Sequence, residues 1–273
     1  MKLTATVIAC ANALSQQEIN HFGCRDGTFY QYSVATANAA GAETDVASSD
    51  NGFNGCHPSQ AMPCVKEELP ACSVSIDSFD ESTLLIVTAG VPDHNAWTLE
   101  NNAAIEGGDS QEFRVPSVPV LKNNGGYTVA NDGAVGFALN GVDIYSGANP
   151  DTCCDFAVDN YDKIDFCTGY STPTFPSYNR YHYHFYPTST EGYEGCLMQT
   201  CNFDLASPLV GVAKDGFPIY GPVQWYSASS GTIWNDPASC SDCELMRMDT
   251  TLLDDCNGLE VEDGVVADGS NYR

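Results

Sequence analysis

A repeat with a constant spacing of 75 residues constrains the fold of this chain most strongly. The run 135–146, Val-Gly-Phe-Ala-Leu-Asn-Gly-Val-Asp-Ile-Tyr-Ser, matches the run 210–221, Val-Gly-Val-Ala-Lys-Asp-Gly-Phe-Pro-Ile-Tyr-Gly. Each copy has an Asn-Gly or Asp-Gly pair between two apolar segments, which is the strongest short-range signal for a β-hairpin with a type I′ turn. We therefore expect two related hairpins. Pro218 has no amide hydrogen, so the outgoing strand of the second hairpin should lie at a sheet edge.

The rest of the chain also favours strands. Short runs rich in Val, Ile, Thr, Tyr and Phe are separated by Gly and Pro over most of the 273 residues, and long helical periods are few. We expect a mostly β fold, a sandwich or packed antiparallel sheets, with the two related hairpin units and with disulfide staples. The stretch 31–40 is the exception, because its composition predicts a loop or a weak helix.

The N-terminus has the features of a removable export signal. Lys2 supplies a positive charge, residues 3–9 form a short apolar run, and small residues follow at the spacing of a cleavage site. Removal of this segment leaves twelve of the thirteen cysteines, an even number that suits complete pairing in an oxidising compartment. We expect a secreted or cell-surface protein. Its expected parts are a signal peptide (1–13), a cysteine-rich N-terminal region (14–75) and a main domain (76–273).

The charge of the chain limits its partners. The sequence has 36 acidic and 10 basic residues, a net charge of -26. Such a field repels phosphate backbones, so we expect no nucleic-acid partner, and no stretch is long and apolar enough for membrane insertion. The acidity favours solubility or cation binding, and calcium is an alternative partner. The acidic residues nearest to a calcium loop lack its Gly and its final Glu: Asp151, Asp155, Asp159, Asp162 and Asp165.

Two of the five histidines stand two residues apart in a run of β-formers. Side chains alternate between the faces of a strand, so His182 and His184 should point one way while Tyr181, Tyr183 and Phe185 point the other. Two neutral imidazoles on one face suit zinc or copper. The alternative is that the two histidines are only the polar side of an amphipathic strand.

Several motifs together resemble one known family. They are the Tyr-His-Tyr-His run 181–184, the Asn-Gly hairpin before it, Asp-Gly-Phe-Pro-Ile-Tyr-Gly at 215–221, Leu-Asp-Asp-Cys-Asn-Gly at 253–258, and Gly-Val-Pro-Asp-His at 90–94. Over residues 76–273 the chain resembles the YHYH domain family, exported proteins of bacteria and eukaryotic microbes. The resemblance implies a fold and export rather than an activity.

The repeat continues beyond the hairpins. Residues 165–169, Asp-Phe-Cys-Thr-Gly, parallel residues 254–258, Asp-Asp-Cys-Asn-Gly, and Tyr181-His182 parallels Tyr272-Arg273. The second copy therefore has Arg273 where the first has a histidine. Either this copy lacks a metal-binding strand or the sequence is truncated before a final strand, and we favour truncation because the repeat otherwise leaves an open sheet edge.

His94 is the third candidate ligand. It follows a Pro-Asp turn after the apolar strand expected at 83–88, and loop residues held by a rigid strand often complete sites. Asp93 or Asp215 could add an oxygen ligand or orient an imidazole. We expect His94, with the histidine pair, to form a three-histidine site for copper or zinc.

Three hypotheses follow. The first is an exported metal-binding protein, and the second is a metal-dependent enzyme that uses the same three histidines to activate water or cycle the metal. The third is a cell-surface or matrix binding module for glycan or calcium, in which the histidine motif is structural. Trp97, Trp225 and Tyr226 are its candidate sugar-stacking residues. The Cys-x-x-Cys at 240–243 lies in a segment with loop character, and we expect no redox role for it.

Overall fold

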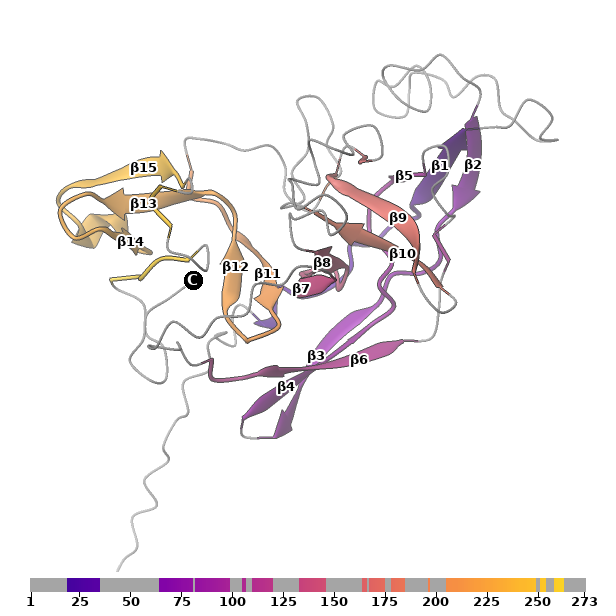
Figure 1. Cartoon of the computed structure of the whole chain (residues 1–273), viewed down its shortest axis with the longest axis horizontal. Helices are drawn as coiled ribbons and strands as arrows, with labels where there is room; N and C mark the ends of the chain where they lie inside the picture. The colour runs from indigo at the N-terminus through magenta and orange to yellow at the C-terminus, as the bar shows by residue number, and fades with distance from the viewer. Residues whose placement is uncertain are drawn as a thin grey trace, which may run out of the picture.

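A computed structural model describes residues 19–34, 64–80, 82–98, 105–106, 110–119, 133–145, 164–165, 167–174, 178–184, 196, 205–248, 251–253 and 258–262. In these residues the chain consists mainly of short strands (Figure 1), with one 3-10 turn, η1 (Pro237–Ser239). Disulfides staple it. The predicted fold class, mostly β with packed antiparallel sheets, is confirmed. The expected signal peptide and the end of the second repeat, with Arg273, lie outside the described residues.

The strands form four sheets. The largest has the order β12 (Pro218–Tyr220), β11 (Leu209–Ala213), β7 (Ala134–Ala138), β8 (Asp143–Tyr145), β10 (Tyr178–Tyr183), β9 (Gly169–Thr174). The others are β3 (Val74–Asp80), β4 (Thr83–Thr88), β6 (Gln111–Pro116); β2 (Cys64–Glu68), β1 (Tyr30–Val34), β5 (Ala96–Thr98); and β14 (Thr232–Trp234), β13 (Val223–Ser227), β15 (Cys243–Arg247). Among these strands only β8–β10 and β1–β5 pair in parallel.

Both predicted hairpins are present, as β7–β8 and β11–β12, and β12 with Pro218 is an edge strand of the described sheet. The predicted turn type was wrong. Gly141 and Gly216 have φ of 79° and 93°, but neither Asn140 nor Asp215 has a positive φ. Each turn is a three-residue loop whose glycine alone takes the left-handed region, which is the commonest longer hairpin connection and needs no strained Asn or Asp.

The two hairpins are related by a local two-fold axis. Phe137 and Val212 occupy equivalent places in the two repeats, and they are also partners across β7 and β11. The hydrogen bonds obey the same symmetry, because Leu139 N donates to Val210 O at 2.8 Å and the equivalent Lys214 N donates to Val135 O at 2.9 Å. The repeat found in the sequence is therefore a repeat in space.

The six-stranded sheet is covered on both faces. Phe137 and Val212 pack on one face against Leu84 and Ile86 of β4, whose alternating pattern buries every second residue. Ala138, Val210 and other apolar residues of the opposite face form a second core cluster. This double covering explains why the polar side chains along the sheet are buried as well.

The expected N-terminal region shares its sheets and contacts with the expected main domain. The boundary between residues 75 and 76 falls inside β3, and β1 pairs with β5. An ion pair joins Arg25 to Asp93 across this boundary, whereas the Cys24–Cys72 disulfide lies within the expected N-terminal region. The loop or helix predicted for 31–40 was wrong for residues 31–34, which belong to β1, because pairing with β2 and β5 overrides weak local propensity. Among the described residues no helix has the length and apolarity needed to cross a membrane.

Candidate metal centre

Strand β10 brings His182 and His184 together. Their side chains are buried, and their Nε2 atoms lie 3.1 Å apart. His182 is paired with Asp143 of β8 and with Tyr170 of β9, so it points to the face that also carries Phe137. We call this the histidine face of the six-stranded sheet. The predicted alternation along the strand is therefore confirmed for these residues, although both faces are buried.

Two tyrosines enclose the histidine pair. The ring of Tyr145 stacks on His182 with centroids 4.1 Å apart, and the ring of Tyr170 stacks on His184 with centroids 5.5 Å apart. Each tyrosine also meets the other histidine edge-on. Sequence reasoning missed both residues, because only the parallel pairing of β8 with β10 and the position of β9 bring them to the pair.

The surroundings keep His182 neutral. Burial lowers the pKa of His182 to about 3, and the neighbouring His184 adds to the effect. Burial also favours the neutral form of Tyr170, because it raises the pKa of its hydroxyl to about 12. Asp143, on the same face, is buried, which raises the pKa of its carboxyl group, although it forms an ion pair with Arg180 at 3.1 Å. A neutral imidazole is the form that binds a metal.

His94 does not join the pair. It is buried, and its Nε2 atom lies 2.7 Å from the hydroxyl of Tyr183 while its Nδ1 atom lies 2.8 Å from the carbonyl oxygen of Asn95. Tyr183 is partnered with Ile144 in the sheet and points away from His182. We call this side the tyrosine face. The structure thus separates the expected three histidines into a pair and a single residue, because successive side chains of a strand lie on opposite faces.

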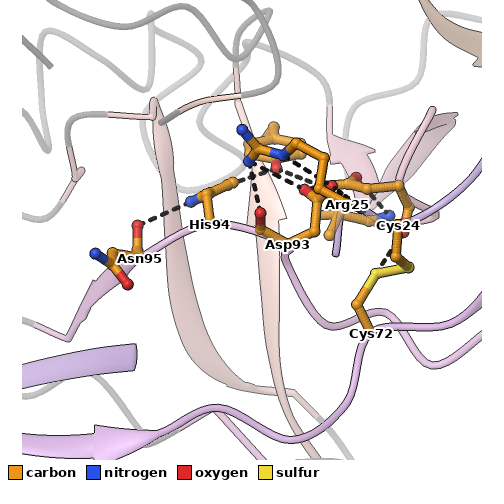
Figure 2. Close-up of polar contacts among 9 residues, drawn as sticks. Cys24, Arg25, Cys72, Asp93, His94 and Asn95 are labelled. Carbon is orange, nitrogen blue, oxygen red and sulfur yellow. Dashed lines mark hydrogen bonds and ion pairs between the residues drawn. A yellow bond between two sulfur atoms is a disulfide. The ribbon is translucent and has the colours of Figure 1, made fainter. Parts of the chain in front are cut away.

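A polar network surrounds His94 (Figure 2). Asn140 Nδ2 donates to Asp93 Oδ1 at 2.8 Å and to the Tyr183 hydroxyl at 3.0 Å. Arg25 donates to the Asp93 carboxylate from its backbone nitrogen at 2.9 Å and from Nε at 3.1 Å. Burial alone would raise the pKa of Asp93, but the bonds from Asn140 and Arg25 outweigh it and lower the pKa. Asp93 is therefore held by an amide and a guanidinium, and Asp215 lies exposed in the second hairpin.

The spacing of the pair suits a shared metal ion. A metal about 2.05 Å from each nitrogen would see them at about 98°, between the ideal tetrahedral and square-planar angles. An N–H···N hydrogen bond between the rings has the same length. Within the part of the chain that the structure describes, no three or more His, Cys, Asp or Glu residues gather in a metal-binding group.

The other sequence candidates lie in another sheet or outside the described residues. Cys240 and Cys243 form a disulfide between η1 and the start of β15. Trp225 and Tyr226 are neighbours in β13 and so lie on opposite faces of that sheet. The side chain of Trp97 lies outside what the structure describes, as do the acidic residues compared with a calcium loop, other than Asp165.

Comparison with known proteins identifies a family for this chain. A family model described as YHYH protein matches residues 112–271, more than half of the chain. That span contains both hairpins, the histidine pair and the two enclosing tyrosines. No curated protein and no solved structure matches the chain. On the family match, the chain belongs to the YHYH family.

Proposed function

We propose that this protein binds a transition metal, copper or zinc, through Nε2 of His182 and Nε2 of His184, and that it does so as an exported protein. The distance of 3.1 Å between these atoms carries the proposal, because one metal ion reaches both nitrogens at ordinary bond lengths. His94 is left out of the ligand set, since its two ring nitrogens are engaged on the tyrosine face.

The enclosure supports a built site rather than a chance contact. Tyr145 and Tyr170 hold the two rings by stacking, and all of these groups stand on neighbouring strands of one sheet. Ligands fixed by packing are preorganised, so less conformational entropy is lost when the metal binds. Three disulfides in the described residues suit an oxidising compartment.

Two protein nitrogens leave coordination positions for water or a substrate. The enzyme alternative uses this same pair, since a metal with an open position can activate water or polarise a carbonyl. Release of product from an ester or from bicarbonate, lost together with the metal, would distinguish an enzyme from a protein that only binds the ion.

The test is elemental analysis by mass spectrometry on protein secreted in native form. The wild type is compared with the double variant His182→Gln and His184→Gln and with the matched control His94→Gln. The control removes another buried histidine, which contacts Tyr183 on the opposite face of the sheet. We expect close to one copper or zinc ion per wild-type chain, none in the double variant, and an unchanged content in the control.

Two outcomes would reject the proposal. A folded wild type without metal would leave the pair as a structural hydrogen bond, and glycan arrays and calcium titration would then test the binding-module hypothesis. Metal that persists in the folded double variant would place the site elsewhere in the chain.

A further inference from the structure

Strand β10 ends at Tyr183, and His184 is the next residue of the chain. Its ring meets His182 only if the chain stays extended through that last residue. A backbone hydrogen bond holds it there, because His184 N donates to Thr168 O at 3.1 Å. Thr168 stands just before β9, so the position of one histidine depends on the turn that begins that strand.

The turn at residues 165–169 is closed by one carboxylate. Asp165 Oδ1 accepts from Cys167 N at 2.8 Å and from Gly169 N at 3.1 Å. The backbone adds two bonds, from Asp165 N to Gly169 O at 2.8 Å and from Thr168 N to Asp165 O at 3.1 Å. These bonds fix the direction of the Thr168 carbonyl group.

Thr168 is strained in this turn. Its φ is 65°, and no other non-glycine residue among those described has a positive φ. β-Branched residues rarely adopt that region, and such strain persists only where the surroundings over-determine it. The equivalent position of the second repeat is Asn257, a residue type that tolerates the left-handed region well.

The turn is fastened to β10 itself. Asp165 Oδ2 accepts from the hydroxyl of Tyr181 at 2.7 Å, and the ring of Tyr181 leaves no room for a Cβ atom at Gly169. A disulfide joins Cys167 to Cys196. The same strand thus carries the histidine pair on one face and, on the other, a tyrosine that holds the turn for His184.

We infer that Asp165 is the positioning residue of the metal centre. It shapes the 165–169 turn so that the carbonyl group of Thr168 keeps His184 in line with His182. The inference rests on the proposed metal-binding function. Asp165 acts through the backbone and does not bind the metal.

The test compares two variants of Asp165 with the wild type, by metal affinity and by amide hydrogen exchange of the metal-free protein. Asp165→Asn keeps an acceptor for the two turn amides but loses the charge that strengthens its bonds. We expect about tenfold weaker metal binding and about tenfold faster exchange of the His184 amide, with a larger loss in Asp165→Ala. The Leu139 amide, bonded to Val210 O, should exchange at the wild-type rate in Asp165→Asn.

Two controls separate positioning from general stability. Ile86→Val weakens the core of β4 and should lower the melting temperature without changing metal affinity or the relative protection of His184. Thr168→Asn installs the residue of the second repeat. It should keep full affinity and raise the melting temperature by about 2 to 4 °C, because the strain is relieved while the turn remains.

The outcomes are distinct. Wild-type affinity and wild-type His184 exchange in folded Asp165→Asn would overturn the inference, and weakened binding in Thr168→Asn would assign the role to the threonine side chain instead. If the wild type takes up no metal but His184 exchange still accelerates in Asp165→Asn, the proposed function fails while the control of His184 by the turn stands.

Discussion

The hydroxyl of Tyr183 lies 2.7 Å from Nε2 of His94, on the side of β10 that faces away from His182 and His184. A single strand therefore serves two separate polar centres. The pair is enclosed by tyrosine rings, whereas His94 belongs to a network with Asp93, Asn140 and Arg25. Substitutions on the two faces should have different consequences.

The folded protein should lose stability in acid through His94. Burial lowers its pKa from 6.5 to about 4, although the bond to Asn95 and the charge of Asp93 oppose this and Arg25 reinforces it. Between these values the unfolded chain binds a proton that the folded chain does not. The contribution of neutral His94 to the free energy of unfolding is therefore fully present above about pH 6.5. It falls by about 3 kcal/mol as the pH drops from there through about 4.

Urea unfolding at pH 7, 5.5 and 4.5 measures this loss. The dependence of unfolding free energy on pH should be shallower in His94→Gln by the equivalent of one proton over that interval. His182 contributes in the same direction, so the informative quantity is the difference between the two proteins. Parallel curves for wild type and variant would contradict the prediction.

Tyr183→Phe should destabilise the protein by about 1 to 3 kcal/mol. The change removes the hydroxyl that contacts both His94 and Asn140, and it leaves a buried ring nitrogen unsatisfied. Denaturant midpoints measure the cost. Tyr226, in β13, is half-buried. Tyr226→Phe is therefore the control and should change the denaturant midpoint little. Equal midpoints for wild type and Tyr183→Phe would show that the network adds nothing to stability.

Gly141→Ala should cost at least about 2 kcal/mol more than Gly231→Ala. Both glycines have positive φ, 79° and 74°, so backbone strain is common to the two changes. Only at Gly141 would the new Cβ collide with a neighbour, the side chain of Thr88, while Gly231 faces open space. Thermal unfolding of the two variants compares them, and similar losses would mean that the hairpin can shift away from β4.

Among the disulfides that the structure describes, the two with the most different loop lengths should contribute differently to the free energy of unfolding. In the chain-entropy picture, Cys24–Cys72, with a sequence separation of 48, stabilises by about 4 kcal/mol. Cys240–Cys243, with a separation of 3, stabilises by about 2 kcal/mol. Paired Cys-to-Ser variants of each bridge, followed by urea unfolding, provide the comparison. A larger loss from the 240–243 pair would reject loop entropy as the main term.

Several local features were predictable from residue order. The Asn-Gly and Asp-Gly pairs predicted both hairpins, Pro218 predicted an edge strand, and the period of two along β10 predicted that His182 and His184 share a face. Each of these depends on residues within a few positions of one another, where backbone sterics and side-chain alternation decide the outcome.

The turn type and the place of His94 were not predictable in the same way. Two adjacent positive φ values were expected at each hairpin, yet the glycine alone absorbs the turn. The loop position after β4 suggested a third ligand for the histidine pair, but His94 is buried against Tyr183, on the opposite face of β10. Neither outcome follows from nearby residues.

The sequence by itself determined the repeat, the β-rich class, the family and the histidine pair as a unit. Only the tertiary structure decided what surrounds that pair. The order of strands in the six-stranded sheet brings Tyr145 and Tyr170 to the two rings. It also brings the turn that contains Asp165 and Thr168 against Tyr181 and the backbone of His184. Local patterns specify which way a side chain points along its own strand, whereas its neighbours depend on which distant strand pairs beside it.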